Sequence, residues 1–85
     1  MSKIEKLIKR FLSIPTDFTY NGLVKLLAHF RYDEETGKTT GSSVEFVNYD
    51  TDKKIKIHKP HPQPFLKEYA IKQIINKLKD HGVIE

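Results

Sequence analysis

The chain has 85 residues, which is too few for two independent hydrophobic cores, so we expect one domain spanning residues 1–85. It contains no cysteine, which excludes disulfides, thiolate metal sites and the disulfide-stapled scaffolds of small secreted proteins. No apolar run is long enough for a membrane span or a signal peptide, so the expected location is the cytoplasm.

The charge is positive and unevenly distributed, with a formal net charge of +4 and a pI of about 9.3. Lys38 is the only basic residue between positions 32 and 52, a stretch that holds six acidic residues. Such asymmetry indicates a polyanionic partner, for which RNA is the first choice. An excess of lysine that serves only solubility is the alternative.

Two helices are predicted in the first third of the chain. Apolar residues recur at i, i+3, i+4, i+7 and i+8 from Ile4 to Leu12, and Pro15 ends this amphipathic helix. Thr19 can cap a second helix that continues to Phe30. The apolar faces comprise Ile4, Leu7, Ile8, Phe11, Leu12, Leu23, Leu26, Leu27 and Phe30.

Three strands are predicted next. A weak strand over residues 31–34 is followed by a polar turn to Gly41, and then by an alternating strand over residues 43–49 with Val44 and Phe46 on its inner face. Residues 50–52 form a hairpin turn. The clearest alternation is in residues 54–59, where Ile55 and Ile57 point inward and the lysines point outward.

Three prolines keep residues 60–64 extended, and a last helix is predicted over about residues 65–80, with Gly82 ending it. The resulting order, α-α-β-β-β-α, predicts an α+β fold in which a three-stranded antiparallel sheet packs against helices on one face. The predicted inner face of the last helix comprises Leu66, Tyr69, Ala70, Ile71, Ile74, Ile75 and Leu78.

The histidines are the main candidates for chemistry. His29 and His81 each end a predicted helix, where a structural role is expected. His58 and His61 lie in the segment H-K-P-H-P after the lysine-lined strand, and imidazole can move protons in RNA cleavage near neutral pH. Ordinary solvent-facing histidines are the alternative. Without a nearby carboxylate or thiol they form a poor metal site, so no metal or cofactor is expected.

Other residues are candidates for contacting RNA. The hydroxyls and amides of Gly41-Ser42-Ser43 could meet a phosphate, or they could simply form a tight turn before the strand. Lys54, Lys56 and Lys59 are expected on one continuous positive face with the lysines of the last helix. Bases could stack on exposed aromatic rings. The aromatic candidates are Tyr20 and Tyr49, whereas Phe46 and Phe65 are assigned to the core.

Three segments together resemble the HicA family of toxin–antitoxin ribonucleases over about residues 17–84. They are D-F-T-Y-N-G-L-V-K-L-L from Asp17, T-G-S-S-V-E-F from Thr40, and I-H-K-P-H-P followed by I-K-Q-I-I and a terminal G-V-I. The resemblance implies a double-stranded-RNA-binding-like fold, sequence-relaxed cleavage of messenger RNA and neutralisation by a HicB-type antitoxin.

The sequence departs from the family pattern at Ser43, where the family has its catalytic histidine. Serine cannot act as a base near neutral pH. His58 or His61 could transfer the proton instead, the protein could be a weak or inactive relative that still binds RNA, or the substitution could have been introduced to reduce toxicity. Besides a metal-independent endoribonuclease using Ser43, His58 and His61, the sequence therefore leaves open a non-catalytic RNA-binding module and a protein-interaction domain.

Overall fold

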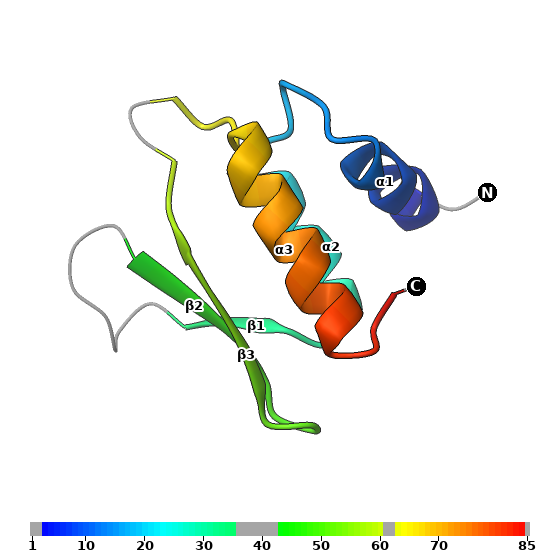
Figure 1. The fold of residues 1–85 in the computed structure, drawn as a ribbon, viewed down its shortest axis with the longest axis vertical. Helices are drawn as coiled ribbons and strands as arrows, with labels where there is room; N and C mark the ends of the chain where they lie inside the picture. The colour runs from blue at the N-terminus through cyan, green and yellow to red at the C-terminus, as the bar shows by residue number, and fades with distance from the viewer. Residues whose placement is uncertain (1–2, 36–42, 61–62, 85) are drawn as a thin grey trace.

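The computed structural model describes residues 3–35, 43–60 and 63–84. Its elements follow the predicted order of two helices, three strands and a helix (Figure 1). None of the described helices is long and apolar enough to cross a membrane. The elements are α1 Lys3–Leu12, α2 Tyr20–His29, β1 Asp33–Glu35, β2 Ser43–Asn48, β3 Lys53–His58 and α3 Glu68–Asp80.

The first two helices form for the reasons that the sequence suggested, with one correction. The Thr19 hydroxyl accepts a hydrogen bond from the Gly22 amide at 3.1 Å, which confirms the predicted cap of α2. In α1, Phe11 is buried, but Leu12 is 43% exposed, so the prediction that Leu12 belongs to the buried face was wrong. Leu12 is the last residue of α1 and does not join the hydrophobic cluster, against which Leu7, Ile8 and Ile14 pack.

The sheet is antiparallel, with β2 between β1 and β3. Val44, Phe46, Ile55 and Ile57 are buried on its inner face, which confirms the predicted alternation of both long strands. Val47 lies on the outer face but is also buried, because it is in the central strand and has a neighbouring strand on each side. The sequence pattern alone predicted the outer face for Val47 but not its burial.

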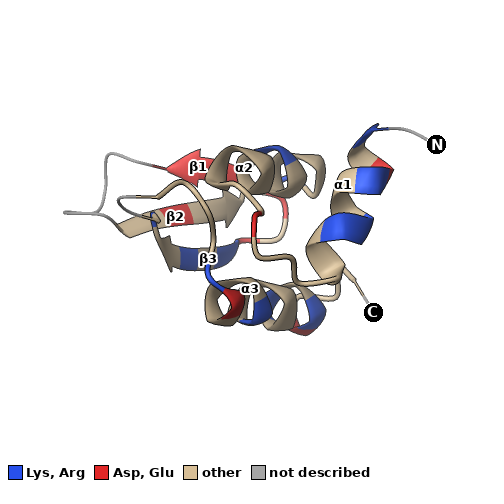
Figure 2. Ribbon diagram, turned by 90° about the horizontal axis from the view of Figure 1, so that it is seen from above, with Lys and Arg blue, Asp and Glu red and all other residues tan. Residues whose placement is uncertain are grey.

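All three helices lie on the same side of the sheet. Figure 2 shows α2 and α3 against the sheet and α1 on the side of these helices away from it. Buried residues from all three helices and from the sheet form a single hydrophobic cluster that includes Phe11, Phe18, Phe46 and Ile74. The predicted α+β architecture, with a three-stranded antiparallel sheet against helices, is confirmed.

The last helix begins three residues later than predicted, at Glu68. Phe65 forms a short antiparallel bridge with Thr19, held by hydrogen bonds from the Tyr20 amide to the Pro64 carbonyl at 2.9 Å and from the Leu66 amide to the Phe18 carbonyl at 2.8 Å. These contacts keep the backbone extended. The buried stripe of α3 is therefore Ile71, Ile74, Ile75 and Leu78.

Two aromatic predictions for this region were wrong. Tyr69 was placed on the inner face of the helix, but it is 61% exposed, because it lies two residues before Ile71 and so on the opposite side of the helix. Phe65 was assigned to the core but is 41% exposed, since it belongs to the bridge and not to the helix.

His81 follows α3, and its structural contact is with Tyr32, whereas the prediction rested on the C-terminus of the helix. Its Nδ1 lies 2.6 Å from the hydroxyl of the buried Tyr32, and the two rings stack. Burial, together with the nearby Lys53 and Lys77, lowers the pKa of His81 below its ordinary value of 6.5, although Asp80 opposes the shift. His81 is therefore neutral at pH 7, which lets Nδ1 accept a hydrogen bond from Tyr32.

This lowered pKa predicts a pH-dependent stability. Below pH 6.5 the unfolded chain binds a proton at His81 more readily than the folded chain, so the free energy of unfolding should fall as the pH drops through this range. The measurement is urea unfolding between pH 7.5 and about 5. The His81→Gln variant should show a smaller decrease than the unaltered chain, whereas the exposed control His29→Gln should keep the full decrease. Equal slopes for all three proteins would contradict the prediction.

Candidate nucleic-acid interface

The central feature of the candidate site is a serine–histidine pair at one end of the β2–β3 hairpin. Ser43, the first residue of β2, lies directly opposite His58, the last residue of β3. The Ser43 Oγ is 3.4 Å from the His58 Nδ1. His58 is exposed and Ser43 is half-buried, so a ligand on the outer face of the sheet could reach both side chains.

The turn at the other end of the hairpin sets this pairing. Asn48 is 6% exposed, and its side-chain oxygen accepts hydrogen bonds from the amides of Asp50 at 2.9 Å and Thr51 at 3.2 Å. Asp52 completes the turn in a left-handed conformation, with φ of 57°. Because the turn closes on the pair Asn48–Lys53, the antiparallel register places Ser43 opposite His58.

Positive charge on the outer face of the sheet is concentrated along β3. Lys54 and Lys56 alternate with the buried isoleucines and so lie on the same face as His58. Their partners across the sheet are Val47 and Glu45, and beyond these lie the acidic residues of β1. Figure 2 shows this gradient as a blue β3 and a red β1. A polyanion would therefore be favoured at the β3 side of the sheet.

Lys59 does not continue this row. Its Nζ lies 5.3 Å from the centre of the Tyr20 ring, at the start of α2. Tyr20 is buried and donates a hydrogen bond to the Glu34 carboxylate. Burial, then this hydrogen bond and the charge of Glu34, raise the pKa of Tyr20. The geometry thus gives Lys59 a cation–π contact in place of the predicted position beside Lys54 and Lys56, and it removes Tyr20 as an open stacking surface.

Three predicted site residues, Gly41, Ser42 and His61, lie outside the described residues. Tyr49, predicted as a stacking surface, is 62% exposed, and it follows β2 at the turn end of the hairpin, away from Ser43 and His58. Within residues 3–35, 43–60 and 63–84, no group of three or more His, Asp or Glu side chains could hold a metal ion.

One family model matches the chain, over residues 20–83, and it describes the HicA toxin of bacterial toxin–antitoxin systems. The chain belongs to the HicA family. The match covers everything from the start of α2 to the end of α3, including the Ser43–His58 pair. No curated protein and no solved structure matches the chain. Membership implies an antitoxin partner and, in general terms, an RNA target.

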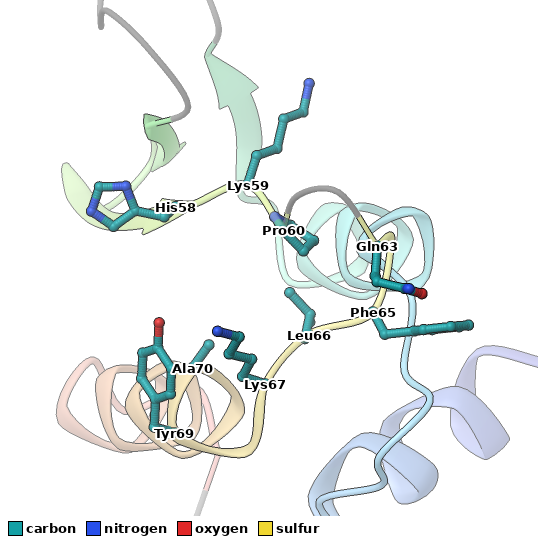
Figure 3. Close-up of a pocket in the computed structure, with 9 residues that line it drawn as sticks. All are labelled: His58, Lys59, Pro60, Gln63, Phe65, Leu66, Lys67, Tyr69 and Ala70. Carbon is teal, nitrogen blue, oxygen red and sulfur yellow. The ribbon is translucent and has the colours of Figure 1, made fainter.

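A pocket of about 340 Å³ opens beside the serine–histidine pair of this HicA chain. His58 and Lys59 form one side of it, and the segment leading into α3 forms the other (Figure 3). Its remaining lining residues are Pro60, Gln63, Phe65, Leu66, Lys67, Tyr69 and Ala70. Sequence reasoning missed Tyr69 as a site residue because it placed this side chain on the buried face of the last helix. The buried stripe of α3 is already complete with Ile71, Ile74, Ile75 and Leu78. Their spacing was the signal that could have shown Tyr69 to be exposed.

Proposed function

We propose that this HicA chain is a metal-independent endoribonuclease that cleaves messenger RNA in the cytoplasm and is held inactive by a HicB-type antitoxin. The observation that carries the proposal is the Ser43–His58 pair on the outer face of the sheet, next to the lysines of β3. We also propose that residues 1–85 act as one HicA-like domain. The single cluster of buried residues from Phe11 to Leu78 supports this.

The proposed chemistry is internal transesterification of the RNA backbone. A 2′-hydroxyl loses its proton and its oxygen attacks the adjacent phosphorus, and the bond from phosphorus to the 5′-oxygen then breaks as that oxygen gains a proton. Imidazole can perform either proton transfer near neutral pH, and we assign this role to His58, with His61 as a second contributor. Lys56 would stabilise the charge on the phosphate, and the Ser43 hydroxyl would donate a hydrogen bond to it. Gly41 and Ser42 are proposed as further phosphate contacts.

The test is to incubate the purified chain with RNA in the presence of EDTA and to look for fragments. Cleavage that continues without divalent cations, and that leaves 2′,3′-cyclic phosphate ends, is the expected result, because the attacking oxygen comes from the RNA itself. Cleavage that EDTA abolishes would contradict the metal-independent mechanism.

A second candidate function is a non-catalytic RNA-binding module, and the observation that favours it is Ser43 itself. Of the Ser43–His58 pair that the described residues form, only the imidazole can transfer protons near neutral pH, whereas the reaction requires two proton transfers. The two candidates differ in one result. The binding module forms a stable complex with RNA and leaves it intact, whereas the enzyme fragments it.

Both candidates predict that the lysines of β3 bind RNA. The pair Lys54→Gln and Lys56→Gln should weaken RNA binding and lower the slope of log K against log salt by about 0.7 for each phosphate of a single strand that these lysines neutralise. Glutamine is preferable to glutamate because Glu45 lies directly opposite Lys56, and two like charges there would destabilise the sheet. The melting temperature should hardly change, since exposed charges contribute little to stability.

The control is the pair Lys3→Gln and Lys6→Gln, which removes the same charge from exposed positions on α1. This pair should leave RNA affinity nearly unchanged. If both pairs weaken binding equally, net charge and not the β3 surface determines affinity.

A further inference from the structure

We propose that the pocket between His58 and Tyr69 binds one unpaired nucleobase of the RNA, directly beside the phosphate that meets Ser43 and His58. The substrate class is therefore single-stranded RNA. The inference rests on the proposed function for the identity of the ligand, but it concerns a different group of residues. Three observations support it: an exposed aromatic ring, the charges around the pocket, and the position of the pocket next to the pair.

The aromatic ring is that of Tyr69. It is 61% exposed and lies on the side of α3 opposite the buried Ile71. Figure 3 shows this ring rising from the start of α3 toward the side of the pocket on which His58 lies. An accessible aromatic ring on the wall of a pocket is the surface on which proteins stack unpaired bases.

The charges and the size of the pocket fit a nucleotide. Lys59 and Lys67 line it, the Lys59 Nζ lying 5.3 Å from the centre of the Tyr20 ring, and none of the described residues that line it is acidic. Glu68, the nearest acid along the chain, pairs with Lys72 at 3.2 Å instead. The volume of about 340 Å³ lies at the small end of the usual range for ligand pockets, about 300–1,000 Å³, which suits a base better than a folded protein element.

The position links the pocket to the pair. His58 both lines the pocket and faces Ser43, so a nucleotide whose base occupied the pocket would carry its phosphate close to the pair. A base can enter such a pocket only if it is not paired in a duplex. Recognition of one unpaired base next to the scissile bond would align that bond without specifying a long sequence.

The experiment measures binding of two single-stranded oligonucleotides by fluorescence anisotropy. Both carry 2′-O-methyl sugars, which have no free 2′-hydroxyl and so prevent cleavage. One oligonucleotide has its bases and the other is abasic throughout. Tyr69→Ala should weaken binding of the oligonucleotide with bases by about 10-fold and leave the affinity for the abasic one unchanged. Tyr69→Phe keeps the ring and should bind as the unaltered chain does.

Tyr49→Ala is the matched control, because Tyr49 is 62% exposed but lies at the other end of the hairpin. It should bind both oligonucleotides normally. Unchanged binding by Tyr69→Ala, or an equal loss for both oligonucleotides, would overturn the inference while leaving the proposed function in place. A Tyr69→Ala variant that binds both normally but no longer binds its antitoxin would show that a protein occupies the pocket. If the unaltered chain binds neither oligonucleotide, the proposed function fails together with the inference.

Discussion

Replacing Ser43 with histidine is expected to raise RNA cleavage by about 10²- to 10⁴-fold, the usual contribution of a general acid or base. The substitution places a second imidazole directly opposite His58, and side chains that face each other in this way have their Cβ atoms about 4.5–5.5 Å apart. Two imidazoles at that separation could flank one phosphate, one removing the 2′-hydroxyl proton and the other protonating the leaving oxygen. The measurements are the initial rate of cleavage in EDTA and the growth of cells that express the variant.

The control is Ser43→Gln, which adds a side chain of similar length that does not titrate near neutral pH. The rate of RNA cleavage by Ser43→Gln should not exceed that of the unaltered chain. The pH–rate profile of Ser43→His should become bell-shaped, because one imidazole must be neutral and the other protonated. If Ser43→His binds RNA as before but neither its cleavage nor its effect on growth changes, the proposed catalytic function is wrong. The function of a non-catalytic RNA-binding module then replaces it.

The hairpin that holds this site was predictable from the sequence, because its physical cause is local. Ile55 and Ile57 alternate with lysines, and a strand with one buried face requires that alternation. The cap at Thr19 was predictable for the same reason, since the hydroxyl and the amide that it binds are only three residues apart.

The register of the hairpin was not predictable in this way. Whether Ser43 faces His58 or a neighbouring residue depends on where the turn closes, and that depends on the buried Asn48 side chain and the amides it binds. The start of α3 was missed for a related reason. The prolines before it signal an extended chain, but only the pairing of Phe65 with the distant Thr19 shows that the extension continues to Lys67.

His58→Ala is expected to reduce whatever cleavage the chain shows by about 10²-fold or more, with RNA affinity changed only a few-fold. The reason is geometric, because His58 is the histidine that the described structure places against Ser43, with Lys56 on the same face. The loss should appear in kcat, since a group that only transfers protons contributes to the transition state more than to binding. Imidazole added to the buffer should restore part of the rate, which it could not do if His58 only bound phosphate.

His29→Ala is the control for the loss of a histidine, because His29 is exposed at the end of α2 and outside the pocket beside His58. It should cleave at the original rate. His61→Ala should also slow cleavage, but by less than His58→Ala. If His61→Ala abolishes cleavage and His58→Ala does not, the proton-transfer role belongs to His61. The contact between Ser43 and His58 then has only a structural role in the hairpin.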